Sequence, residues 1–274
     1  MERNCTVYFA KNAADAMFHL KNTSNLQVCG ACTQLSTLPE STLIIRNIEE
    51  FRYIERRERY IEFGSAVTLS QLLELGEKRL PTILYEALRS TANPLVRNVA
   101  TVGGNICAKG IKHTLFAPFL AVDARLELRS PVETKTIPMS QFNHVPSGFL
   151  LSKIRYNLDE WDVSVFRRLG PMYSIDDTSA SFVFLARTQK NVLSDLRVAF
   201  CGSVRFRSRD VENILIGGKL PLSERDIQVM LESAAEAFDS TSICDQNNQK
   251  KDVTSSVMRS RFLNLLKYSL EQLT

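Results

Sequence analysis

The stretch that decides the fold runs from residue 90 to residue 106 and reads STANPLVRNVATVGGNI. Within it, the composition of residues 94–105 predicts a polar loop that contains two adjacent glycines, Gly103 and Gly104. Because glycine has no Cβ, neighbouring backbone N–H groups can converge on one point there. Such a nest suits an anion such as a diphosphate, and Thr101 and Asn105 would add side-chain donors. An ordinary tight turn is the alternative interpretation of the same residues.

A second small-residue segment follows a short apolar strand nearer the N-terminus. The strand is expected at residues 26–29, and the segment at 29–34 reads CGACTQ, with the Thr33 hydroxyl as a further donor. Both segments follow apolar runs and use small residues, so each is a candidate anion-binding loop. On mechanism alone, two ordinary tight turns remain the simpler interpretation.

Hydrophobic periodicity predicts the other elements. Asn12 and Thr68 are expected to be the N-caps of two helices, because their side-chain oxygens can accept from the first helical turn. Strands are expected at 42–45, 60–63, 124–128, 149–156, 163–167, 180–186 and 193–201, and further helices after Pro81, at 115–122, from Ser223 and at 257–273. Residues 188–191 predict a polar turn, and residues 239–252 predict a surface loop.

Length and composition bound the class of protein. The 274 residues are enough for more than one compact core, and 44% hydrophobic with 23% charged residues is ordinary for a soluble globular chain. The net charge is +4, and the densest basic cluster, residues 52–59, is interleaved with glutamates. Mixed charge predicts a solvated face and not a nucleic-acid site. No stretch approaches the roughly 18 apolar residues of a membrane span, and no secretory signal is recognised. A cytoplasmic protein with reduced thiols is therefore expected.

Few residues offer catalytic or metal chemistry. Cys29 and Cys32 form a CxxC pair, which elsewhere is redox-active or ligates a metal. The sequence has no second CxxC and only three histidines, His19, His113 and His144, so a four-ligand zinc site is not expected. A thiol role for the pair stays open. The GxSxG, HExxH, P-loop and GxGxxG motifs are absent, so we predict no catalytic residue on this chain and no Rossmann-type site.

The stretch at 90–106 resembles the IRNxATIGGN signature of the FAD-binding (medium) subunits of the xanthine dehydrogenase and carbon monoxide dehydrogenase family of molybdenum hydroxylases. Four further segments resemble the same family: 61–68 its xIGAxVT strand and helix start, 119–124 its LLALDA segment, 166–171 the opening of its C-terminal domain, and 215–220 its LxGKxL turn. The resemblance therefore covers nearly the whole chain.

The resemblance implies an α+β fold with a two-lobed PCMH-type FAD-binding domain at residues 1–168. Lobe 1 would cover about 1–57 and lobe 2 about 58–168, and a smaller α+β C-terminal domain with an antiparallel sheet would follow at 169–274. The resemblance also implies a function, in which FAD accepts electrons from 2Fe–2S clusters and passes them to NAD or another acceptor. A molybdopterin-binding large subunit and a 2Fe–2S small subunit are the expected partners in a hetero-oligomer, and they would carry those two cofactors.

By the same resemblance the FAD diphosphate lies between the two loops. The implied FAD-binding residues are Gly30, Ala31, Cys32, Thr33, Gln34, Leu35, Asn98, Thr101, Val102, Gly103, Gly104, Asn105, Thr114 and Leu120.

The chain departs from the family pattern around this ligand. The family's AGGTDL reads GACTQL at 30–35, so Ala31 and Cys32 replace two glycines. If either position needs a positive φ, the substitution costs about 1 kcal/mol or more. An ungapped count places Thr114 where the family's PxSDxxP has its aspartate, and Met172 stands where an arginine or lysine is common. Positive charge on Lys109 and Lys112 would partly offset these losses.

Two alternatives follow from these departures and from the glycine pair. In the first alternative to the flavin subunit, the chain is a degenerate scaffold subunit of the same complex that no longer binds FAD. In the second, it is a stand-alone nucleotide-binding or sensor protein that uses the Gly103–Gly104 segment.

Overall fold

A computed structural model describes residues 5–35, 37–244 and 252–274. The chain forms two compact units. The first unit comprises Met1–Pro81, Thr91–Lys109 and Asp123–Leu158, and the second comprises Thr82–Ser90, Gly110–Val122 and Asp159–Thr274. The two domains expected from sequence, with boundaries near 57 and 168, stay a prediction.

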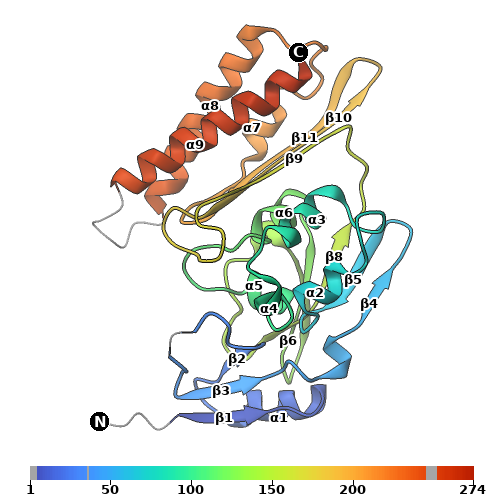
Figure 1. Ribbon diagram of the computed structural model, residues 1–274, viewed down its shortest axis with the longest axis vertical. Coiled ribbons are helices and arrows are strands. Elements are labelled where there is room, and N and C mark those ends of the chain that lie inside the picture. The colour runs from blue at the N-terminus through green and yellow to red at the C-terminus, as the bar shows by residue number, and fades with distance from the viewer. Residues whose placement is uncertain (1–4, 36, 245–251) are drawn as a thin grey trace. The chain divides into compact units, whose positions relative to one another are not determined.

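The first unit begins with a small parallel sheet. Its elements are β1 (Thr6–Phe9), α1 (Ala13–Asn22), β2 (Gln27–Cys29) and β3 (Ser41–Ile44), and the strand order is β1-β3-β2 (Figure 1). The predicted cap is confirmed, because the Asn12 side chain accepts a hydrogen bond of 2.8 Å from the Asp15 N–H. Ala16 and Leu20 then bury one face of α1 against Leu43 of the sheet.

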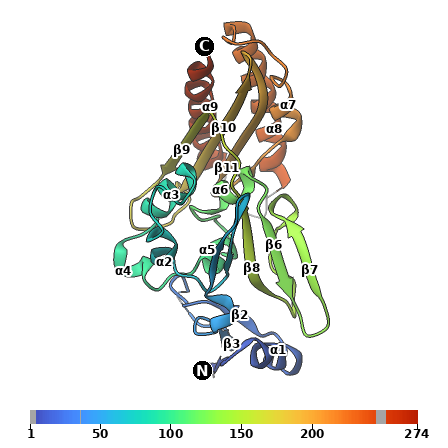
Figure 2. The same cartoon turned by 90° about the vertical axis from the view of Figure 1, so that its right-hand side faces the viewer.

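A five-stranded antiparallel sheet completes the first unit. Its strands are β4 (Ile54–Arg56), β5 (Tyr60–Gly64), β6 (Arg125–Arg129), β7 (Thr134–Pro138) and β8 (Leu150–Asn157), in the order β4-β5-β8-β6-β7 (Figure 2). The short helices of this unit are η1 (Glu49–Phe51), α2 (Leu69–Leu73), α4 (Pro94–Arg97), α5 (Val102–Ile106) and η2 (Met139–Gln141). The Thr68 hydroxyl caps α2, as predicted.

The two faces of this sheet differ in polarity, as the strand period of two requires. Ile61, Phe63 and Ile154 are buried on one face. On the other face Glu62 accepts hydrogen bonds from the Tyr53 hydroxyl at 2.9 Å and from Arg155 Nη2 at 3.0 Å. Burial pushes the pKa of Glu62 up, but these hydrogen bonds outweigh it and hold the pKa below its usual range. This face is therefore fixed by a charged network.

The second unit is built on a four-stranded antiparallel sheet. Its strands are β9 (Val163–Leu169), β10 (Ala180–Gln189), β11 (Val192–Cys201) and β12 (Arg205–Phe206), in the order β12-β11-β10-β9. Its helices are α3 (Thr82–Arg89), α6 (Phe116–Ala121), α7 (Arg209–Asn213), α8 (Glu224–Cys244), α9 (Asp252–Leu270) and η3 (Glu271–Leu273). Figure 1 shows α8 and α9 lying along one face of the sheet. The turn predicted between β10 and β11 is confirmed, with positive φ at Lys190 and Asn191.

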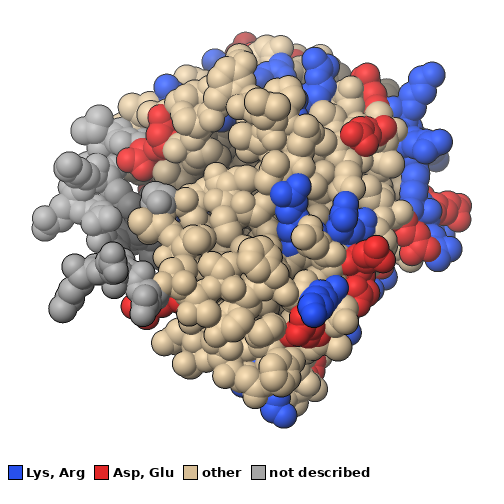
Figure 3. Space-filling view, turned by 60° about the horizontal axis from the view of Figure 1, so that its bottom comes forward, with Lys and Arg blue, Asp and Glu red and all other residues tan. Residues whose placement is uncertain are grey.

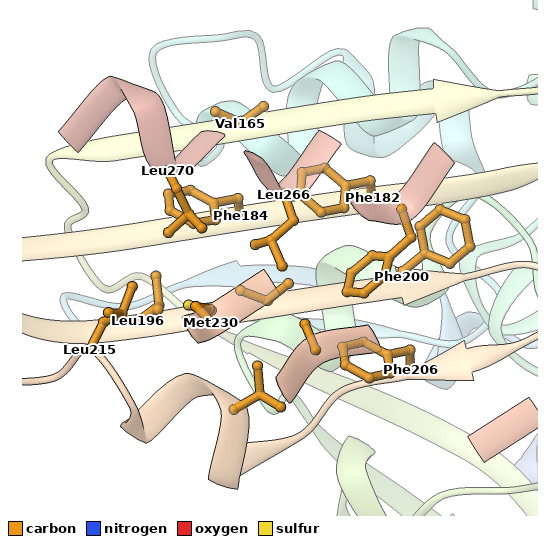
Figure 4. Close-up of a cluster of buried hydrophobic side chains, with 14 of the residues drawn as sticks. Val165, Phe182, Phe184, Leu196, Phe200, Phe206, Leu215, Met230, Leu266 and Leu270 are labelled. Atoms are coloured by element: carbon orange, nitrogen blue, oxygen red, sulfur yellow. The ribbon is translucent and has the colours of Figure 1, made fainter. Parts of the chain in front are cut away.

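An aromatic cluster forms the core between this sheet and the two long helices (Figure 4). The Phe262 ring of α9 lies 4.6 Å from the Phe206 ring and 5.2 Å from the Phe238 ring, between centroids. Phe182 and Phe200 of β10 and β11 contact the same ring. Phe262, Leu266 and Leu270 of α9 therefore pack in one core cluster with residues of the sheet.

The structure corrects several expectations. The loop expected at 94–105 contains α4 and α5, because Asn93 and Thr101 cap them and Pro94 occupies a first-turn position. The loop expected from residue 239 was also wrong at its start, since α8 continues to Cys244, while residues 245–251 lie outside the described part of the chain. The C-terminal helix begins earlier than predicted, and the sequence analysis missed β4, β7, β12 and α7.

Charge is mixed on the surface that Figure 3 shows. Among the described residues on that face, lysines and arginines are interspersed with aspartates and glutamates and form no continuous basic stripe. Among the described helices, none combines the length and apolar character that a bilayer crossing requires.

Candidate functional site

The structure brings the two predicted loops into contact within the first unit. A Cβ added to Gly30, directly after β2, would collide with the Thr101 hydroxyl at the start of α5. Residues 65–69 hold α5 in place from the other side, since Thr68 and Thr101 form an antiparallel bridge and the Gly103 N–H donates to the Ser65 carbonyl at 2.9 Å. Gly30 is therefore required by the close approach of the two segments.

A cavity of about 450 Å³ opens where these segments meet. That volume lies within the roughly 300–1,000 Å³ typical of small-molecule sites. Its wall consists of three stretches and two single residues, all in the first unit: Asn25–Gly30 without Cys29, a stretch from Thr101 to Lys109, residues 144–151, Ile45 and Ser65. The predicted residues that line it are Gly30, Thr101, Gly103 and Gly104.

The backbone amides of residues 102–105, in the loop predicted around the glycine pair, already have acceptors. The Val102 N–H donates to the Val67 carbonyl at 2.9 Å, and the Gly104 N–H donates to the Thr101 hydroxyl at 3.0 Å. The Gly103 and Asn105 N–H groups are likewise bonded to carbonyls, of Ser65 and Thr101. The interpretation of this segment as a nest of unoccupied donors was wrong, because helix α5 and its cap use those amides within the protein.

The loop at residues 29–34, called the first loop below, differs in the hydrogen bonding of its backbone amides. None of the N–H groups of residues 30–33 donates to an acceptor among the described residues. Gly30 lines the cavity, and Cys32 has a φ of 54°, in the left-handed region. Ala31 does not share that conformation. Of the two lost family glycines, the one at position 32 is therefore the strained one.

Replacing Cys32 by glycine is expected to stabilise the protein. Glycine accepts a positive φ without the steric cost of a Cβ, so the free energy of unfolding should rise by about 0.5–1 kcal/mol. Ala31→Gly is the matched control, and it should lower the free energy of unfolding, because glycine there only adds freedom to the unfolded chain. Urea unfolding of the two variants measures the difference, and equal shifts would contradict the strain at Cys32.

The CxxC pair lies beside this loop. Burial, together with the neighbouring Cys32, raises the pKa of the Cys29 thiol to about 12. Cys29 is therefore a protonated thiol at neutral pH. Among the described residues, no group of three or more histidine, cysteine, aspartate or glutamate side chains is placed to hold a metal ion.

The Lys109 side chain gives the described cavity wall a positive charge. Lys109 lines the cavity, and its Nζ lies 3.5 Å from the Gln27 Oε1. The described lining includes no aspartate or glutamate, so the electrostatic balance of this wall favours an anionic group.

Other predicted residues lie outside this cavity. Asn98 accepts a hydrogen bond from the Ser70 hydroxyl, and Val102 and Asn105 are buried behind the wall. Leu35 lines a separate hollow with Cys5, Leu38 and neighbouring residues. Ala31, Cys32, Thr33 and Gln34 form the first loop but are not part of the cavity wall.

Two predicted residues belong to the second unit. Thr114 and Leu120 are buried there, and the Leu120 carbonyl accepts a hydrogen bond of 2.6 Å from Arg207 Nη1. His113 beside them is also buried, and burial together with the charge of Lys112 lowers its pKa to about 4. It is therefore neutral at physiological pH.

Sequence reasoning missed part of the wall. Residues 144–151 include Pro146 and Gly148, the latter with a φ of 78°, and these two residues are a turn signal that could have marked a loop. Ser65 was also missed, and its motif showed no reason to single it out. Contacts between distant segments put these residues beside Gly30, and periodicity does not reveal such contacts.

Comparison with known proteins identifies the class. A family model described as the FAD binding domain in molybdopterin dehydrogenase matches residues 3–154. The chain therefore belongs to this family, and the resemblance to FAD-binding medium subunits is confirmed.

Individual relatives agree with the family. The xanthine dehydrogenase FAD-binding subunit of Escherichia coli O157:H7 is 39% identical over 160 residues, which are 57% of this chain and 52% of that one. The carbon monoxide dehydrogenase medium chain of Hydrogenophaga pseudoflava is 30% identical over 176 residues, 59% of this chain and 58% of that one. The match spans about half the length of these curated relatives.

Solved structures support the fold. Carbon monoxide dehydrogenase from Hydrogenophaga pseudoflava superposes with a TM-score of 0.82 at 19% identity, covering 100% of this chain and 98% of that one. Quinoline 2-oxidoreductase from Pseudomonas putida 86 gives 0.78 at 13% identity, covering 100% and 99%. The α+β fold, with a PCMH-type domain and a C-terminal region built on an antiparallel sheet, is thereby confirmed.

Proposed function

We propose that this chain is the flavin subunit of a molybdenum hydroxylase and that it holds FAD in the cavity of the first unit. The observation that carries the proposal is the family match over residues 3–154, which includes all three stretches of the cavity wall. The close approach of Gly30 to Thr101 supports it, because a larger residue at position 30 would push apart the two segments that line the site.

The residues present fit a dinucleotide diphosphate. The Gly30 N–H has no acceptor among the described residues, and the Thr101 hydroxyl accepts from Gly104 while keeping its own hydrogen to donate. The Lys109 ammonium adds a positive charge to the same wall. We therefore assign diphosphate binding to these three groups. The roles that the resemblance implied for the other residues, Thr114 and Leu120 among them, stay predictions.

Bound FAD would supply one- and two-electron redox chemistry, which suits a position between 2Fe–2S clusters and NAD or another acceptor. The chain itself binds and orients the cofactor. The partners in this proposal are a molybdopterin-binding large subunit and a 2Fe–2S small subunit, with which the chain forms a hetero-oligomer.

Cofactor content tests the proposal. The full chain, purified alone and with its co-purifying partners, is denatured and the released flavin is quantified by chromatography. About one FAD per chain is the expected result. A flavin-free complex that retains hydroxylase activity would instead establish the scaffold alternative, which the strained Cys32 favours. Absence of iron–sulfur and molybdopterin chains from the purified assembly would favour the stand-alone nucleotide-binding protein.

A further inference from the structure

The Ser65 hydroxyl in the first unit is buried and makes no hydrogen bond to any described residue. Ser65 follows β5 and is 2% exposed, and its Oγ has no hydrogen-bond partner among the residues that the structure describes. Its backbone is fully used, since its N–H donates to the Ser152 carbonyl and its carbonyl accepts from the Gly103 N–H, both at 2.9 Å. Only the side chain is therefore unsatisfied, and a buried polar group in that state costs stability.

The same residue lines the cavity. Ser65 lies in the cavity wall with Gly30, Thr101 and Gly104. A ligand bound in the cavity would therefore supply the hydrogen-bond acceptor that the Ser65 hydroxyl lacks. The family pattern xIGAxVT has an alanine at this position, so the hydroxyl is a feature of this chain and is not demanded by the fold.

The chemistry of the wall indicates which part of a ligand lies nearest. Lys109 supplies a cation, Thr101 a hydroxyl donor and Gly30 an unengaged N–H, and the described lining includes no carboxylate. A set of donors around a cation favours phosphate oxygens over a neutral ring.

We propose that the Ser65 hydroxyl donates a hydrogen bond to the diphosphate of the dinucleotide held in this cavity. The inference rests on the proposed function. The hydroxyl replaces part of the binding free energy that the lost glycines at positions 31 and 32 would otherwise provide.

Ser65→Ala tests this assignment in the full chain, stripped of cofactor and titrated with FAD and separately with ADP. A hydrogen bond to a charged oxygen predicts that the Kd for both ligands rises about ten-fold or more. The ligand-free variant should unfold at the same temperature as the parent or about 2 °C higher, because the mutation removes an unsatisfied buried group. Affinity and apo-stability thus move in opposite senses, which a merely structural role would not produce.

Ser269→Ala is the matched control. That serine is also buried, but its hydroxyl donates to the Leu265 carbonyl at 2.8 Å within α9, so the variant should lose apo-stability and keep its Kd for FAD. An unchanged Kd in Ser65→Ala, or a lower unfolding temperature of its ligand-free form, would overturn the inference. Weaker binding of FAD with unchanged binding of ADP would move the contact away from the diphosphate and overturn it as well. Failure of the parent chain to bind FAD at all would count against the proposed function instead.

Discussion

Gly103→Ala is expected to abolish FAD retention and to lower the free energy of unfolding by about 2–3 kcal/mol, the usual range for overpacking a dense site. A Cβ on Gly103 would lie 2.7 Å from both the Cβ and the carbonyl oxygen of Ser65. That oxygen is backbone at the end of β5, and it also accepts the Gly103 N–H. The strain therefore has no flexible side chain to absorb it, and α5 must separate from residues 65–69.

Gly104→Ala provides the control for that experiment. Its Cβ would approach only the Thr101 hydroxyl, at 3.1 Å, and alanine in a helix is otherwise favourable by about 0.5–1 kcal/mol. The apo-protein should therefore unfold near the parent temperature, while the added methyl group in the cavity wall weakens FAD binding. Calorimetry on the ligand-free proteins and flavin titration separate the two effects. Equal unfolding temperatures for the two variants would show that the Gly103–Ser65 contact is not tight.

The glycine pair shows what a sequence can and cannot predict about this site. The residues at 29–34 and 101–105 were predicted to form two loops of one site, and the structure brings these two segments into contact. The mechanism inferred for Gly103 was different from the one observed, because that glycine is needed where α5 packs on Ser65 and its N–H is already bonded. A sequence shows that a glycine is present, but the atom opposite it comes from a residue about forty positions away, which is a tertiary contact.

The sequence predicted some helix starts at which the capping side chain and the N–H group that it accepts from lie within a few residues of each other. The caps Asn12 and Thr68 were found because the acceptor and its N–H partner lie three residues apart. The short helices α4 and α5 were missed although Asn93 and Thr101 cap them in the same way, because the glycines of the segment lower its helix propensity. Contact with residues 65–69 stabilises α5, and that contact is not visible in a local window.

The stretch of the cavity wall at residues 144–151 was not predicted, because its place in the wall also depends on tertiary contacts. Residues 144–151 line the same cavity as Gly30 and Gly104, and β8, which begins at Leu150, pairs with β5 and β6, which are separated from it in sequence. The family resemblance supplied loop residues but not this wall. The cavity therefore depends on sheet register as much as on the two loops.

The second large effect on the free energy of unfolding is expected at the buried ion pair of Glu212 and Arg207 in the second unit. Glu212→Ala is expected to destabilise the protein by about 4 kcal/mol, within the range for breaking a buried ion pair. Glu212 is 2% exposed and accepts hydrogen bonds from the Val198 N–H at 2.9 Å and from Arg207 Nε at 3.0 Å. Its removal leaves the Arg207 guanidinium buried without a counter-ion, and a backbone N–H of β11 loses its acceptor.

Arg207 makes this loss extend beyond one pair, because its Nη1 also donates to the Leu120 carbonyl at the end of α6. An uncompensated charge would turn toward water, so α6 would lose that contact as well. Asp239→Ala is the comparison, since the Asp239–Arg259 pair at 2.7 Å is exposed and should contribute less than about 1 kcal/mol. Urea unfolding of both variants gives the two free energies. A similar small loss for each would mean that water reaches Glu212 and that its ion pair does not join α6, α7 and β11.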